Sequence, residues 1–116
     1  MIEPDTPLPP DGQGQAFARV LLQQTGAAGG AAEAVGLRVQ IVEGLAAYLR
    51  QNNPAATVAD LIAFVQRAPA RTWRAFMLTS PSLIAGQCGL SLVVVPDDRL
   101  DAARTDVTRA LATLNA

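Results

Sequence analysis

Histidine and lysine are both absent from the sequence, and cysteine occurs once, at Cys88. Without histidine, Ser-His-Asp catalysis, Cys-His catalysis and imidazole acid–base chemistry are excluded. Without lysine, Schiff-base chemistry and the phosphate-binding lysine of a P-loop are excluded as well. A single cysteine permits no internal disulfide and no cysteine-cluster metal site. We therefore predict a protein that is not an enzyme and that needs neither a metal nor an organic cofactor.

Aromatic residues and net charge are also scarce. The chain of 116 residues has one Trp, one Tyr and three Phe, and its formal net charge is −1. So small a charge gives little long-range attraction to nucleic acid or to an anionic membrane. All nine basic residues are arginine, which together with the abundant alanine is typical of a GC-rich bacterial genome. The length indicates one domain with one modest core, built from Leu, Val, Ile and Ala.

The first twelve residues contain four prolines and three acidic side chains. This composition predicts a flexible Pro-rich arm over residues 1–12 that is not part of the core, followed by a single helical domain over 13–116. The start of the chain lacks the basic residues and the apolar run of a secretory signal. With a single cysteine as well, we expect a cytoplasmic protein.

Helical spacing is clear in the first half of the domain. We expect a helix over 13–25, with Phe17, Val20 and Leu21 on its buried side and Gly26 as its left-handed C-cap. The glycine-rich composition of residues 26–32 predicts a turn between helices. A second helix is predicted over 31–51, with an apolar side formed by Val35, Val39, Val42, Leu45, Ala46 and Leu49. Inside it, residues 37–41 alternate apolar and polar, so a half-buried strand is the competing interpretation.

Two more helices are predicted from their starting residues. Thr57 and Asp60 form a variant capping box before a helix whose apolar side carries Val58, Leu61, Ile62 and Val65, and which Pro69 ends. Asp97 is the predicted N-cap of the last helix. Its apolar residues then recur at spacings of three and four: Leu100, Ala103, Val107, Ala110 and Leu114.

The segment between these helices is nearly uncharged. We expect a short helix over 69–78, entered through Pro69, and a short β-hairpin near residues 83–95, where consecutive valines favour strand. Pro81 and the glycines that follow interrupt the run from Ala75 to Pro96, so we predict no membrane span. The predicted fold is mainly α, with α+β at the margin: a small bundle of four to five helices with this one hairpin.

Two features could be taken for catalytic motifs. Asp97, Asp98 and Asp101 match the D-D-x-x-D pattern of prenyl-transferring enzymes, but one copy at a helix start is explained by the helix dipole. Cys88 has no neighbour in sequence that would activate its thiol, so a small buried side chain is the expected role.

The charges at the start of the uncharged segment indicate a binding surface instead. Arginine and tryptophan are enriched at protein interfaces. We predict a partner-binding site formed by Arg67, Arg71, Trp73, Arg74, Phe76 and Met77. The predicted function is a protein–protein interaction module (an adaptor, chaperone-like protein, inhibitor or assembly subunit) that binds another protein or itself as a homo-oligomer. The alternative is a small nucleic-acid-binding regulator that uses Arg67, Arg71, Arg74 and Trp73.

Overall fold

A computed structural model describes residues 2–67 and 97–115 of the chain, and these ranges are mainly helical. The helices are α1 (Gly14–Gln24), α2 (Ala32–Asn52), α3 (Val58–Arg67) and α6 (Asp97–Ala112), with short 3-10 helices η1 (Asp11–Gln13) and η3 (Thr113–Asn115). The described ranges contain no strand, only an isolated bridge between Pro7 and Thr57. A mainly α fold is therefore confirmed. The helix predicted over 69–78 and the hairpin predicted near 83–95 lie outside the described residues.

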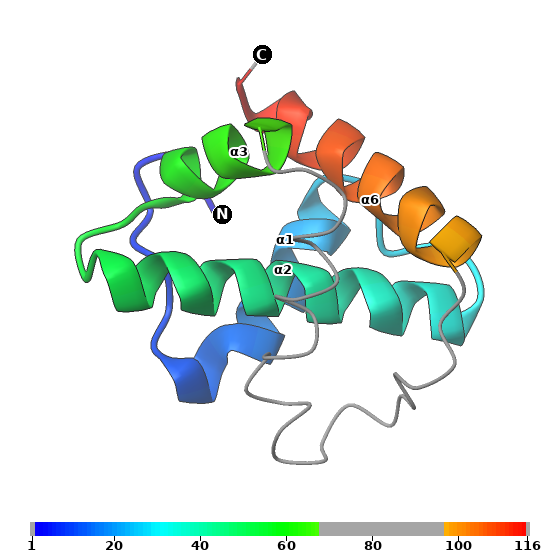
Figure 1. Cartoon of the computed structure of the whole chain (residues 1–116), viewed down its shortest axis with the longest axis horizontal. Coiled ribbons are helices and arrows are strands. Elements are labelled where there is room, and N and C mark those ends of the chain that lie inside the picture. Colours follow the sequence, from blue (N-terminus) through cyan, green and yellow to red (C-terminus); the bar gives the residue numbers. More distant parts are fainter. Residues whose placement is uncertain (1, 68–96, 116) are drawn as a thin grey trace.

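The long helix α2 lies at the centre of the fold. In Figure 1, α3 and α6 lie above it and α1 crosses it from behind, and each of these three helices contacts it. Residues 39–47 of α2 are all buried, so this stretch has no solvent-facing side. A helix buried around its whole circumference needs apolar side chains on every face. Ile41, Val42 and Leu45 are fully buried there.

Two polar side chains share this buried stretch of α2. Gln40 is 1% exposed and Glu43 is 2% exposed, and both have interaction partners. Glu43 packs against the start of α1, because a Cβ placed on Gly14 would lie 3.0 Å from its Cγ. The absence of a side chain at Gly14 thus lets α1 come close to the stem of a buried glutamate.

The structure decides between helix and strand for residues 37–41, which lie inside α2. The helical interpretation is confirmed, and the alternating pattern of five residues does not produce a strand. The predicted apolar side is confirmed at its centre, where Val39, Val42, Leu45 and Ala46 are buried, while Val35 and Leu49 are partly buried at its ends.

Helix α1 ends in the left-handed turn that the sequence predicts. Gly26 has a φ of +80°, its N–H donates to the Gln23 carbonyl, and the Ala27 N–H donates to the Leu22 carbonyl. These two bonds form a Schellman motif, which satisfies carbonyls that the helix itself leaves unpaired. The buried side of α1 differs from the prediction. Leu21 is buried and Phe17 is partly buried, but Val20 is 49% exposed, and Ala18 and Leu22 are buried in its place.

Helix α3 begins as predicted. The Asp60 carboxylate accepts a hydrogen bond from the Thr57 backbone N–H at 2.9 Å, which is the reciprocal half of a capping box. The four predicted apolar residues are all buried: Val58, Leu61, Ile62 and Val65. The apolar side of the last helix is confirmed, since Leu100, Ala103, Val107 and Ala110 are buried in α6 and Leu114 is partly buried beyond it. Asp97, predicted as the N-cap, is instead the first residue of the helix itself.

The N-terminal segment, predicted to lie outside the core, contacts it. Leu8 is a buried member of the core, and its N–H donates to the Ala56 carbonyl at 3.0 Å. The Gln24 side chain exchanges two hydrogen bonds with the backbone of Ile2. The prolines of this segment have no backbone N–H, but its carbonyls can still accept hydrogen bonds. The Thr6 carbonyl accepts one from the backbone N–H of Val58. The segment therefore contributes a side chain to the core, which its composition did not indicate.

The turn after α1 provides a matched test of backbone conformation. A Cβ at Gly26 or at Gly29 would meet no atom within 4 Å, but only Gly26 of the two has positive φ. We expect Gly26→Ala to lower the free energy of unfolding by about 1–2 kcal/mol, because alanine is strained in the left-handed region. Gly29→Ala should change it by less than about 0.5 kcal/mol. Urea unfolding followed by circular dichroism measures both, and equal effects would contradict the assignment.

Candidate functional site

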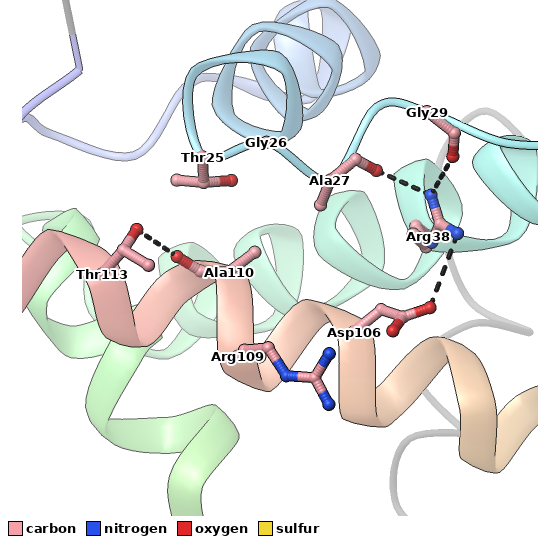
Figure 2. Close-up of a pocket in the computed structure, with 9 residues that line it drawn as sticks. All are labelled: Thr25, Gly26, Ala27, Gly29, Arg38, Asp106, Arg109, Ala110 and Thr113. Carbon is pink, nitrogen blue, oxygen red and sulfur yellow. Dashed lines mark hydrogen bonds and ion pairs between the residues drawn. The ribbon is translucent and has the colours of Figure 1, made fainter.

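An open cleft of about 370 Å³ lies between the turn that follows α1 and the second half of α6. One wall is the turn and the other is α6, and Arg38 of α2 lies between them (Figure 2). The lining residues are Thr25, Gly26, Ala27, Gly29, Arg38, Asp106, Arg109, Ala110 and Thr113. The walls come from segments about eighty positions apart in the chain, and they meet because α1 and α6 both pack on α2.

Arg38 joins the two walls of this cleft. Its Nη1 donates to the Ala27 carbonyl at 2.7 Å and to the Gly29 carbonyl at 2.8 Å. Its Nη2 lies 3.4 Å from Asp106 Oδ2 on α6. The Arg38 side chain is only 12% exposed and that of Asp106 is 40% exposed, so the ion pair has one buried and one solvated end. Hydrogen bonds from a charged donor are stronger than neutral ones. Arg38 therefore fixes the turn relative to α2 and α6.

Asp106 and Arg109 present opposite charges to the cleft from α6. They are three positions apart, which places them as neighbours on one side of the helix. Within the described ranges, Arg109 forms no ion pair with Asp106 or with another carboxylate. The two threonine hydroxyls of the cleft donate inward to backbone: Thr25 to the Leu21 carbonyl at 2.8 Å, and Thr113 to the Ala110 carbonyl at 2.6 Å.

The predicted partner-binding residues lie mostly outside the described part of the chain. Arg67 is the last residue of α3 and is exposed. The others fall in the segment that the structure does not describe: Arg71, Trp73, Arg74, Phe76 and Met77. The same holds for Cys88.

An aromatic pair lies one helical turn before Arg67. Phe64 of α3 contacts Tyr48 of α2, with ring centroids 5.8 Å apart and planes inclined by 45°. Tyr48 is 38% exposed and Phe64 is partly buried, so the pair reaches the protein surface. Phe64 and Arg67 are three positions apart on α3 and are therefore neighbours on its surface. We call Tyr48, Phe64 and Arg67 the aromatic–arginine surface.

Sequence reasoning did not select the residues of the cleft or the aromatic pair. The partners of Arg38 lie at positions 27, 29 and 106, and no local pattern brings these positions together. A signal was nevertheless present, because Arg38 lies between the apolar residues Leu37 and Val39 within a predicted helix. A charge in such a place usually has a specific partner. Tyr48 and Phe64 were two of only five aromatic residues, and aromatic side chains are enriched at interfaces.

The acidic start of α6 carries no metal-site geometry. Asp98 and Asp101 are exposed in the first turns of the helix. Among residues 2–67 and 97–115, no three acidic or cysteine side chains converge. A membrane-crossing helix is likewise not found in these ranges, where no helix is both long and apolar enough.

Known proteins give no guide to the function, since no protein-family model, curated protein or solved structure matches the chain. Any functional assignment therefore depends on the chemistry of these two surfaces.

The contacts of Arg38 predict an order of stability among variants. We expect Arg38→Met to lower the free energy of unfolding by about 1.5–3 kcal/mol, because two carbonyl contacts and an ion pair are lost together. Asp106→Asn should cost less, about 0–1 kcal/mol, since it weakens only a half-solvated pair. Arg19→Met, on the exposed side of α1, is the control for loss of an arginine. Chemical unfolding measures all three, and an Arg38 variant as stable as the Arg19 variant would contradict this assignment.

Proposed function

We propose that this chain is a non-enzymatic protein-binding module that acts in the cytoplasm, and that it binds another protein or a second copy of itself through the aromatic–arginine surface. The observation that carries the proposal is the position of Arg67. The structure describes one residue of the predicted partner-binding set, and that residue neighbours an aromatic pair at the surface. Tyrosine and arginine are over-represented among the residues that dominate binding energy at interfaces.

The geometry of the pair supports recognition of a protein surface. Tyr48 is partly exposed while Phe64 packs against the core, so the pair is held in place by the fold and reaches solvent. A ring held in this way loses little conformational freedom when a partner covers it. Arg67 adds a charged group with five donors that suits a carboxylate of the partner. The predicted residues at 71–77 follow directly in the chain after α3.

The nucleic-acid alternative receives less support. It requires a positive surface, and the net charge of the chain is −1. The proposed surface contains one arginine, whereas phosphate binding needs several positive charges acting together. We therefore retain protein binding as the function and treat binding to nucleic acid as an outcome of the test below.

Two variants test the proposed surface. Tyr48→Ser removes the exposed ring and Arg67→Glu reverses the charge at an exposed position. If the chain self-associates, sedimentation equilibrium should show the dissociation constant rising at least about tenfold in each variant, the effect of losing one important contact. Val20→Ser is the matched control, because it removes an apolar side chain that is 49% exposed on α1. It should leave association unchanged.

If the chain is monomeric, the same variants are compared by quantitative capture of proteins from cells of the source. A partner should be retained by the wild type and by Val20→Ser, and lost by Tyr48→Ser and Arg67→Glu. Thermal melting checks that the variants fold. A stable monomer whose captured proteins do not differ between variants would contradict the proposal, as would salt-dependent binding of nucleic acid that Arg67→Glu abolishes.

A further inference from the structure

We propose that the cleft between the turn after α1 and helix α6 binds a small zwitterion of the α-amino-acid class. The carboxylate of the ligand binds Arg109 and its ammonium group binds Asp106. This inference does not depend on the proposed protein-binding function, because the cleft shares no residue with the aromatic–arginine surface.

The two charged groups needed for such a ligand are in place and available. Only one oxygen of Asp106, Oδ2, contacts Arg38, at 3.4 Å from its Nη2. A carboxylate accepts about four hydrogen bonds, so most of its capacity remains. Its side chain lines the cleft and is 40% exposed, which gives an ammonium group access. Arg109 is exposed and forms no ion pair within the described ranges, and its planar fork of donors matches a carboxylate.

The cleft presents separate groups of opposite sign to a ligand. Asp106 is negative and also contacts Arg38, and Arg109 is positive and lies beside it on α6. An acid without an amino group would bind Arg109 but would also face the Asp106 carboxylate. A simple amine would bind Asp106 but would face Arg109. A zwitterion places an opposite charge on each, since Asp106 and Arg109 are neighbours three positions apart on α6.

The size and the walls of the cleft suit a ligand of this class. Its volume of about 370 Å³ accommodates an amino acid together with bound water. Gly26 and Gly29 form part of the opposite wall, and a side chain on either would point into open space, so the backbone there is accessible. Arg38 holds this wall in place through the Ala27 and Gly29 carbonyls. The two walls are therefore already fixed before a ligand enters (Figure 2).

Nuclear magnetic resonance of the ¹⁵N-labelled full chain tests this site. Alanine, serine, leucine and glutamine are titrated singly, with butyrate and butylammonium as one-charge probes and sodium chloride as the ionic-strength control. We expect saturable shifts of the amides of Gly26, Gly29 and Arg109 with at least one amino acid. Butyrate and butylammonium should bind at least about tenfold more weakly, since each lacks one charged contact.

Variants then assign the two contacts. Arg109→Gln should weaken amino-acid binding about tenfold, and Asp106→Asn should do the same. Arg19→Gln, an exposed arginine on α1, should leave it unchanged. Since Asp106 also contacts Arg38, a folding defect in that variant is checked by melting, and Arg109→Gln decides the question alone if the defect occurs. The proposal is overturned if no amino acid gives saturable shifts, if butyrate binds as tightly, or if Arg109→Gln binds like the wild type.

Discussion

The fold depends on the burial of α2 around its whole circumference between Val39 and Ala47. A helix with no solvent-facing side must be covered by other elements, and α1, α3 and α6 all contact it. Buried polar groups are costly unless they are paired, so Gln40 and Glu43 restrict which arrangements around α2 are acceptable. Both have partners, although Gln40 Oε1 accepts no hydrogen bond from the described residues, and Glu43 also packs on Gly14 of α1. The other three helices thus pack around this one helix, and α3 and α6 also contact each other.

Features that depend on neighbours in sequence could be predicted, and features that depend on distant contacts could not. The capping residues of α3, the left-handed Gly26 and the repeating apolar side of α6 are local, and all three are confirmed. The spacing of apolar residues identified α2 as a helix. It did not indicate that the polar residues Gln40 and Glu43 are buried, because a polar residue is assumed to face water unless its partner is known. The contact of Leu8 with the core was missed for a related reason, since composition alone suggested a mobile arm.

The candidate sites follow the same division. Arg67 was selected because it begins a run with three arginines and a tryptophan, which is a property of the sequence. Its neighbours in space, Tyr48 and Phe64, belong to different helices and become adjacent only through the packing of α3 on α2. The cleft depends still more on tertiary structure. Its charged groups at 38, 106 and 109 share no motif, and it is assembled only when the turn after α1 reaches α6.

Arg38 links the stability of the bundle to the shape of the cleft. The same guanidinium that holds the turn at Ala27 and Gly29 also contacts Asp106, which lines the opposite wall. The proposed ligand binds Asp106 and Arg109, which both lie on the α6 wall, and it uses the acceptor capacity of the Asp106 carboxylate that Arg38 leaves open. Because the proposed ligand binds the folded chain, it stabilises that state by an amount that grows with the logarithm of its concentration relative to its dissociation constant. Binding in the cleft and folding of the bundle are therefore coupled equilibria.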